Sequence, residues 1–330
     1  MKRAKKLLVL LGILAVLTAG VIAAGSLFGS DDDMPDADDA IIPVVFSPGT
    51  LTAVNWQSGG ATLSLEKGSD GYWFYADDPS FPLDQSYPEA MISQLEGLTA
   101  SRRFDSSAGS GDYGLDDPVC IITAISADGA STVINIGNQN AVTREYYLTL
   151  GGGDNIFMVS EALVGAFPSE LLDLAVINVF KTMNTINAIT IRNGDKMIET
   201  VYDDEIDDDY DWFIVAGKDT LWPLSSSEMS NLKASVYSLR MDSCVNYKPS
   251  ESDIAEYGLD KPGSMTVRYI PHDEEEEVTV TFLFGKTDDA GAYVRLEGEI
   301  PVYLADASVA EKILSADYST LKPEIKEGEV

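Results

Sequence analysis

The sequence predicts an α+β fold with two tandem repeats of a mostly antiparallel sheet. Each repeat is expected to carry one longer and one short helix, and both follow an N-terminal transmembrane helix. Three observations lead to this class: a seven-residue motif that occurs twice, strand-like segments that alternate apolar and polar residues, and an unbroken apolar run near the N-terminus. A chain of 330 residues with 45% hydrophobic residues is long enough for one large or two modest cores.

The repeated motif sets the organisation of the chain. Residues 112–118 read DYGLDDP and residues 256–262 read EYGLDKP. An apolar, strand-like run follows each copy, and a later segment of each repeat ends in Gly137 or Gly285. Repetition of a motif together with its ordered surroundings is the signature of a duplicated domain.

We expect the motif to form a structural turn. Gly114 and Gly258 can adopt a positive φ at low cost, the leucine that follows each can enter the core, and each proline suits the start of a strand. A binding role for Tyr113 and Tyr257 is the alternative. The residues assigned to the turn are Tyr113, Gly114, Leu115, Asp116 and Pro118, and Tyr257, Gly258, Leu259, Asp260 and Pro262.

The remaining elements of the two repeats match in order. Apolar residues spaced by three and four predict helices over 88–99 and 226–239, with Ser225 or Ser226 as the N-cap of the second. Short helices are expected over 160–167 and 306–314. Three strands precede the longer helix of each repeat, and four strands follow the turn through short links typical of hairpins. Within the later strands we align Tyr146 with Tyr293.

The N-terminus predicts a membrane anchor. Four basic residues, Lys2, Arg3, Lys5 and Lys6, precede an apolar run from Leu7 to about Phe28. As a helix this run spans about 33 Å, which matches the hydrocarbon core of a bilayer. The basic side remains cytoplasmic, so the bulk of the chain is expected to be extracytoplasmic on a single-pass anchor in the cell membrane. A signal peptide cleaved near Ala23-Ala24-Gly25 is the competing interpretation.

The segments expected along the chain follow from these features. They are 1–29 (basic tip and anchor), 30–46 (acidic tether), 47–180 (first repeat), 181–322 (second repeat) and 323–330 (charged tail). The tether holds six aspartates between Asp31 and Asp39, which makes it a solvated, self-repelling spacer. Loose binding of divalent cations by these carboxylates is the alternative.

The charge excludes several classes of function. A net charge of −32 repels phosphates, so nucleic acid is not an expected partner. One His and two Cys cannot supply a multi-ligand zinc site, an iron–sulfur cluster or a disulfide framework, and no cofactor is expected. Because the anchor holds four basic residues and no acid, the part beyond it carries −36.

The candidates for catalysis are weak, and the chain is predicted not to be an enzyme. The single histidine, His272, lies in the charged segment PHDEEEE and is expected at an exposed hairpin tip. Ser-x-x-Lys occurs at Ser64, Ser230 and Ser319, without the accompanying motifs of serine enzymes that use this spacing. Carboxylate pairs for a hydrolase are always available in so acidic a chain, so their abundance is no evidence.

The densest carboxylate run covers residues 203–211. Asp207, Asp209 and Asp211 imitate the start of a calcium loop, but Trp212 and Lys218 replace the glycine and glutamate that an EF-hand requires. A solvated hairpin end is the expected structure. Loose Ca²⁺ or Mg²⁺ binding by these three aspartates, or docking of a partner, is the alternative.

Two other residue types leave alternatives open. Cys120 and Cys244 are expected to be buried thiols, although a disulfide between the repeats is compatible with an extracytoplasmic location. Trp73 and Trp212 occupy equivalent strand positions, which favours packing in the core over a sugar-stacking platform.

The duplicated turns resemble those of the domain of unknown function 4340 family of bacterial proteins. The resemblance is carried by the two YGLDxP turns, the strands that end at Gly137 and Gly285, the hairpins that follow, and the anchor; it covers about residues 50–320. The acidic insertion at 203–211 departs from the pattern. The resemblance implies association with an ABC-type transport system related to the gliding-motility group, and it implies no catalytic residues.

Three functions are therefore expected in different degrees. The first is a non-catalytic extracytoplasmic accessory protein of an ABC-type transport system. The second is a module that binds an envelope polymer or cations through its acidic surface or exposed aromatic residues, and the third is a carboxylate-based hydrolase. Burial of Trp73 and Trp212 would favour the first, and their exposure in a groove would favour the second.

Overall fold

The computed structural model describes residues 42–43, 46, 48–105, 110–151, 153, 155–218 and 220–323. The chain divides into two compact units, Met1–Ile42 and Pro43–Val330. The predicted anchor and nearly all of the acidic tether lie outside the described residues. Among the described residues, no helix combines the length and the apolar character needed to cross a bilayer.

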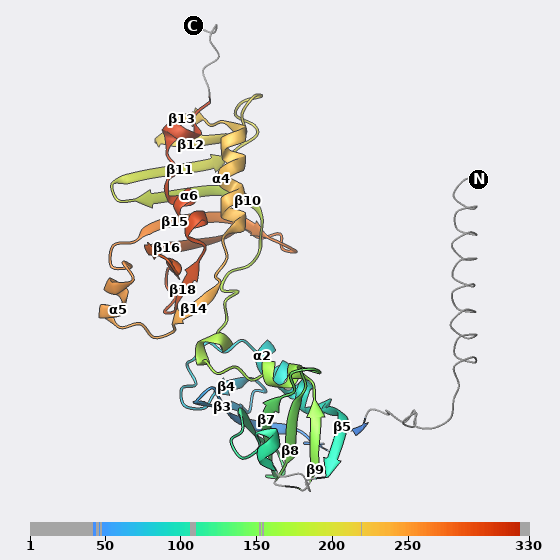
Figure 1. The fold of residues 1–330 in the computed structure, drawn as a ribbon. Helices are drawn as coiled ribbons and strands as arrows, with labels where there is room; N and C mark the ends of the chain where they lie inside the picture. The colour runs from blue at the N-terminus through green and yellow to red at the C-terminus, as the bar shows by residue number, and fades with distance from the viewer. Residues whose placement is uncertain are drawn as a thin grey trace, which may run out of the picture. The chain divides into compact units, whose positions relative to one another are not determined.

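The first described sheet is antiparallel and contains nine strands in the order β1-β5-β9-β8-β7-β6-β2-β3-β4. Its strands are β1 (Ile42–Pro43), β2 (Leu51–Ser58), β3 (Ala61–Lys67), β4 (Trp73–Tyr75), β5 (Thr99–Asp105), β6 (Cys120–Ser126), β7 (Ser131–Gln139), β8 (Tyr146–Leu150) and β9 (Asn155–Val159). The helices α2 (Ser86–Glu96) and α3 (Glu161–Gly165) accompany it, with the 3-10 helices η2 (Ser110–Tyr113) and η3 (Leu171–Leu174) (Figure 1).

The second described sheet is also antiparallel, with nine strands in the order β13-β12-β11-β10-β15-β16-β17-β18-β14. Its strands are β10 (Met183–Asn193), β11 (Lys196–Tyr202), β12 (Trp212–Gly217), β13 (Thr220–Pro223), β14 (Ser243–Asn246), β15 (Gly263–Pro271), β16 (Val278–Asp288), β17 (Gly291–Leu296) and β18 (Val302–Ala305). Its helices are α4 (Ser226–Ser238), α5 (Glu251–Glu256), α6 (Ala307–Leu314) and α7 (Tyr318–Leu321) (Figure 1).

The two sheets share one topology. In each, the first long strand of the repeat (β2 or β10) pairs with the next strand along the chain on one side and with the strand after the turn motif (β6 or β15) on the other. The strand after the longer helix (β5 or β14) pairs with the last strand, β9 or β18. This identical order confirms the tandem duplication and the predominance of antiparallel sheet.

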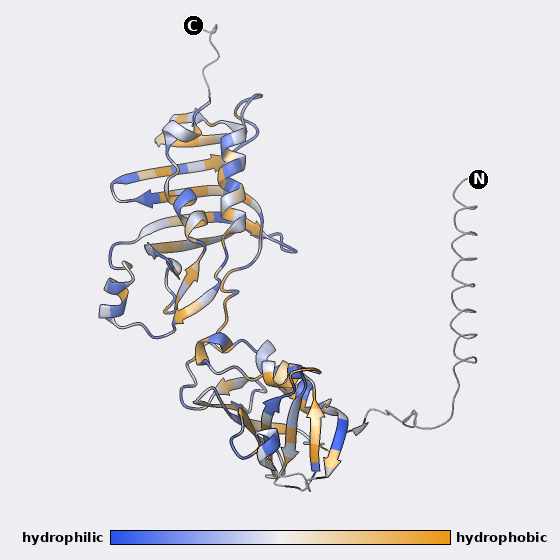
Figure 2. Ribbon diagram, viewed as in Figure 1, coloured by the Kyte–Doolittle hydropathy of each residue, from blue (hydrophilic) through white to orange (hydrophobic). Residues whose placement is uncertain are grey.

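The cores form where one face of each sheet meets its helices. In α4 the buried residues are Met229, Leu232 and Val236, which lie three and four positions apart and so share one face of the helix. The side chain of Ser225 caps this helix by accepting a hydrogen bond from the Glu228 amide. Figure 2 shows hydrophobic and hydrophilic residues alternating along the strands of both sheets, as expected for sheets with one covered face.

The structure departs from the sequence prediction in three elements of the sheets and in the number of helices. The strands β5, β13 and β14 were not expected, because β5 contains Arg102 and Arg103 and the other two have only four residues. The second repeat carries four helices where one longer and one short helix were predicted. Short or charged edge strands do not repeat apolar residues often enough to reveal themselves in a sequence.

Candidate functional site

The repeated turns hold their glycines in a left-handed conformation. Gly114 has a φ of 70° and Gly258 has a φ of 71°. The first glycine follows the 3-10 helix η2 and the second follows α5 and its C-cap, Tyr257. Other residues adopt this conformation only at a cost, so the same backbone requirement explains both glycines.

The backbone of each turn packs against the glycine that ends a strand. The Tyr257 carbonyl accepts a hydrogen bond of 2.8 Å from the Lys286 amide, next to Gly285 in β16. A Cβ at Gly285 would overlap that carbonyl oxygen, and a Cβ at Gly137 in β7 would overlap the carbonyl oxygen of Tyr113. The turn and the strand glycine therefore form one packing unit, which is present in both repeats.

The tyrosine rings of the motif pack on a second tyrosine in the neighbouring hairpin. Ring centroids of Tyr113 and Tyr147 are 4.7 Å apart, and those of Tyr257 and Tyr293 are 4.8 Å apart. The alignment of Tyr146 with Tyr293 was wrong by one residue, because Leu148 pairs with Ile136 where Val294 pairs with Phe284, which makes Tyr147 the equivalent of Tyr293. A shift of one residue moves a side chain to the opposite face of a strand, and only Tyr147 faces the turn.

The other members of the motif differ between the copies. Leu259 is buried, whereas Leu115 is half-buried. Asp116 and Asp260 are exposed, and Pro118 and Pro262 lie just before β6 and β15. The contacts of these residues are those of a turn that fastens a sheet edge.

The aspartates proposed for loose cation binding lie in the loop between β11 and β12. The loop is closed by a hydrogen bond of 2.8 Å from the Asp203 amide to the Asp211 carbonyl, and the Asp207 carboxylate accepts one of 2.8 Å from the Asp209 amide. Among the described residues, no group of three or more His, Cys, Asp or Glu side chains is placed to hold a metal ion. The structure therefore does not bring Asp207, Asp209 and Asp211 together, and cation binding there stays a prediction.

The hydroxyl and imidazole groups considered for catalysis have local partners. The Ser230 hydroxyl donates to the Ser226 carbonyl at 2.7 Å, and the Ser319 hydroxyl donates to Asp317 at 2.5 Å as part of the α7 cap. His272 lies in the turn between β15 and β16 with its Nδ1 2.8 Å from the carboxylate of its neighbour Asp273. Each contact is local and belongs to a helix or a turn.

Three of the four tryptophans are part of the cores. Trp73 and Trp212 are 6% and 4% exposed, and Trp56 donates a hydrogen bond of 2.8 Å from its indole nitrogen to the Pro168 carbonyl. Burial of Trp73 and Trp212 confirms their packing role and removes them as a sugar platform. Trp222 in β13 is 47% exposed. Sequence reasoning missed this difference because β13 itself was missed.

The two cysteines are buried free thiols, as expected. Burial raises the pKa of Cys120 to about 11. Burial also raises the pKa of Cys244 to about 11, against a small opposing effect of a hydrogen bond from the Asn246 backbone. A thiol with so high a pKa is protonated and unreactive at neutral pH.

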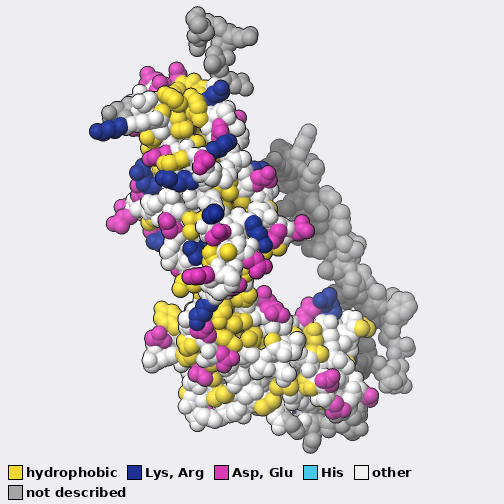
Figure 3. Space-filling model, turned by 90° about the vertical axis from the view of Figure 1, so that its left-hand side faces the viewer, with side chains coloured by type: hydrophobic (Ala, Val, Ile, Leu, Met, Phe, Trp, Pro, Cys, Tyr) yellow, Lys and Arg dark blue, Asp and Glu magenta, His cyan; other side chains and the backbone are white. Residues whose placement is uncertain are grey.

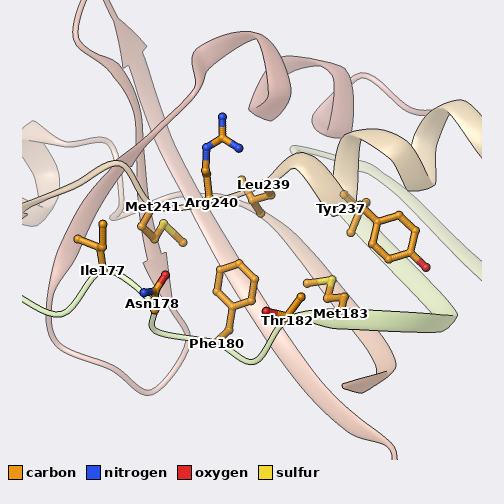
Figure 4. Close-up of a pocket in the computed structure, with 10 residues that line it drawn as sticks. Ile177, Asn178, Phe180, Thr182, Met183, Tyr237, Leu239, Arg240 and Met241 are labelled. Atoms are coloured by element: carbon orange, nitrogen blue, oxygen red, sulfur yellow. The ribbon is translucent and has the colours of Figure 1, made fainter. Parts of the chain in front are cut away.

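The best-enclosed cavity described lies where the segment before β10 passes the end of α4. It measures about 180 Å³. Figure 4 shows Phe180 and Met183 from the first segment facing Leu239 and Met241 from the second, while the guanidinium of Arg240 extends away from them. The residues around it are Ile177, Asn178, Phe180, Thr182, Met183, Val236, Tyr237, Leu239, Arg240 and Met241. Apolar walls and one exposed cation suit a side chain of a partner better than a metabolite, because small-molecule sites usually exceed about 300 Å³.

A polar contact joins the loop after β4 to the segment after β14. The carboxylate of Asp78 accepts hydrogen bonds from the Lys248 ammonium at 2.5 Å and the Tyr247 hydroxyl at 3.0 Å. The Lys248 contact, followed by the Ser80 hydroxyl, holds the pKa of Asp78 far below its usual range. Tyr247 also packs edge-on against Phe81 with centroids 5.0 Å apart. Sequence periodicity contains no signal for such a contact between distant loops.

The comparisons with known proteins agree with this duplicated architecture. The family model described as domain of unknown function (DUF4340) matches residues 73–222 and again residues 212–320. The two matches begin at the equivalent residues Trp73 and Trp212 and together cover well over half of the chain. No curated protein and no solved structure matches it. The chain therefore belongs to the DUF4340 family and carries two copies of its repeat.

Proposed function

We propose that the chain is a non-catalytic extracytoplasmic accessory protein that associates with an ABC-type transport system of the cell envelope. The basic tip and apolar run of residues 1–29 support the membrane location and orientation. The duplicated motif supports a scaffold, because its tyrosines and glycines are engaged in packing the turns against the strands.

The observation that carries this proposal is the burial of Trp73 and Trp212. The two residues at matched positions of the repeats serve the cores, so the duplication multiplies a scaffold and not a pair of aromatic binding platforms. The cavity beside Arg240 adds a feature that suits a protein partner, since its volume of about 180 Å³ accommodates one anchoring side chain.

Site-specific crosslinking in intact membranes tests the proposal. A photoreactive phenylalanine analogue replaces Arg240 at the rim of the cavity, and in a control chain it replaces Tyr72, which is 65% exposed in the first repeat. We expect an adduct at position 240 that mass spectrometry identifies as a transport-system subunit, and much less of it at position 72. Recovery of the protein alone from both positions, with normal expression, would count against the accessory function.

Binding of an envelope polymer or of cations is the second candidate function. The acidic loop at 203–211 is its basis for cations, and calorimetric titration with Ca²⁺ tests it. Absence of heat at millimolar Ca²⁺ would remove that candidate. The aromatic part of this candidate concerns different residues from those expected and is argued below.

A further inference from the structure

Trp222 differs from the other tryptophans in its environment. It is 47% exposed, while Trp56, Trp73 and Trp212 are all nearly buried. Its ring contacts that of Tyr318 in α7, with centroids 5.1 Å apart and planes at 45°. The contact fixes the orientation of the indole while about half of its surface stays in water.

The aromatic pair lies at the free edge of the second sheet. β13 is the last strand of that sheet and pairs with β12 on one side. Figure 3 shows apolar side chains gathered at the end of the second repeat from which the C-terminal residues continue, where Figure 1 places β13. Leu221, the neighbour of Trp222, is also exposed and contributes to the apolar surface there.

A polar groove of about 220 Å³ runs beside α7. Glu228, Asn231 and Ser235 line it from α4, and Lys312, Ser315 and Thr320 line it from the opposite side. Leu232, Ala316 and Leu321 are its apolar members. Because α7 is only four residues long, about 6 Å, the Tyr318 ring and the groove residues Thr320 and Leu321 stand within one helical turn.

The chemistry of the groove matches a neutral sugar. A pyranose ring offers an apolar C–H face that packs on an indole, and a rim of hydroxyls that both donate and accept hydrogen bonds. The amide of Asn231, the hydroxyls of Ser235 and Thr320, the acceptor Glu228 and the donor Lys312 supply both kinds of partner. One acid and one base leave the groove without excess charge.

Two observations favour a neutral sugar over other occupants. The net charge of −32 repels anionic polymers at long range, which disfavours acidic glycans and nucleic acids. The groove is lined mainly by hydroxyl, amide and charged groups, whereas anchor pockets for protein partners are desolvated and apolar.

We propose that Trp222 and Tyr318, together with the groove between α4 and the α6–α7 segment, form a binding site for a neutral oligosaccharide. The indole stacks on one sugar ring and the groove residues hydrogen-bond the hydroxyls of the next. This site is separate from the cavity beside Arg240, and its occupation is independent of association with a transport system.

Calorimetric titration of the full-length protein tests the site. The protein is kept in a detergent without a sugar headgroup, and the probes are tetramers of β-1,4-linked glucose and of β-1,4-linked N-acetylglucosamine, with a galacturonate tetramer as the anionic comparison. We expect at least one neutral tetramer to bind with a Kd of about 1 mM or below, and the anionic tetramer to bind more weakly.

Matched variants separate stacking from general effects of substitution. We expect Trp222→Ala to weaken binding about tenfold and Trp222→Tyr, which keeps an aromatic ring, to retain most of it. Asn231→Ala is expected to weaken binding without changing the fold, and Tyr72→Ala, at an equally exposed aromatic residue of the other repeat, to leave it unchanged. Circular dichroism verifies that each variant is folded.

Two results would overturn the proposal. One is the absence of binding of both neutral tetramers up to about 10 mM by the folded wild-type protein. The other is binding by folded Trp222→Ala that equals the wild type. If neither tetramer binds but Trp222→Ala abolishes crosslinking to a transport subunit, the aromatic pair is a protein-docking surface and the sugar site is rejected while the accessory function stands.

Discussion

At the scale of single residues, the repeated turn depends on the absence of side chains at two strand glycines. Gly285 and Gly137 have ordinary φ angles, so their requirement is steric and not conformational. The carbonyl oxygens of Tyr257 and Tyr113 occupy the space that a Cβ would need. The tyrosine in each turn and the glycine in each strand are therefore one structural feature written at two places in the sequence.

We predict that Gly285→Ala destabilises the protein by about 1–3 kcal/mol, because the added methyl group meets a backbone oxygen that cannot rotate away. Gly165→Ala is the matched control, since a Cβ there meets nothing within 4 Å and its position in α3 favours alanine over glycine. Urea denaturation measures both. A loss in Gly285→Ala no larger than in Gly165→Ala would contradict the packing unit.

A second prediction concerns the thiols. Cys120 and Cys244 have their pKa raised to about 11 by burial, so both are protonated at pH 8 and shielded from solvent. We expect no alkylation of the native protein by iodoacetamide over an hour, and two additions after denaturation without reductant, measured as intact mass. One or no addition after denaturation would show that the cysteines are paired.

At the scale of elements, the short helices of the second repeat depend on their caps. The α5, α6 and α7 helices begin at Ser250, Asp306 and Asp317, whose side chains accept hydrogen bonds from the first turn. Helices of four to eight residues are not stable by propensity alone. Their positions are therefore set by capping and by contact with the sheet, and polar residues at their starts carry more of the structure than the apolar pattern reveals.

The cap of α6 gives a pH-dependent prediction. Hydrogen bonds from the Ser308 hydroxyl, and then from the Val309 and Ser308 amides, lower the pKa of Asp306. Because the folded pKa is below the unfolded one, the carboxylate stabilises the fold above the unfolded value and loses this contribution as the pH falls toward the folded value. We expect a higher Tm for wild type than for Asp306→Ala at pH 7, with the difference shrinking below about pH 4.

Asp128→Ala is the comparison for this series, because Asp128 caps a tight turn in the first repeat and not a helix. Calorimetry from pH 7 to pH 3 gives both Tm profiles. A difference between wild type and Asp306→Ala that stays constant across this range would show that the carboxylate charge is not involved.

At the scale of the whole molecule, the two repeats are joined by contacts that neither repeat contains alone. Asp78 and Phe81 belong to the first repeat, and Tyr247 and Lys248 belong to the second. The aromatic pair is apolar, while the ion pair is partly exposed and subject to screening by salt. The two kinds of contact therefore respond differently to ionic strength.

We predict that Lys248→Ala lowers the Tm at low salt and that this loss diminishes at about 1 M NaCl, because screening already weakens the pair in the wild type. The same variant should raise the pKa of Asp78 toward its usual range, since Lys248 is the largest cause of its depression. Arg240→Ala is the control, because its cation lies 3.7 Å from Asp242 within the second repeat and joins no other repeat. A loss that is independent of salt would mean that Lys248 acts through packing.

The sequence by itself determined the duplication, the antiparallel sheets and the positions of the main helices. Residues 112–118 and 256–262 marked the repeat because a left-handed glycine and a core leucine are required wherever this turn occurs. The apolar spacing of Met229, Leu232 and Val236 marked α4 because one helical face must be buried. These features are local or periodic, and the physical rules that govern them act within a few residues of chain.

Only the tertiary structure decided which polar and aromatic residues are exposed together. Trp222, Tyr318 and Asn231 are brought to one edge of the sheet by strand order and helix packing, and the sequence holds no period that relates them. The same holds for the pairing of Tyr147 with Tyr113 and for Asp78 with Lys248. Contacts between distant segments depend on register and on how sheets and helices pack, and a one-residue shift of register reverses the face on which a side chain lies.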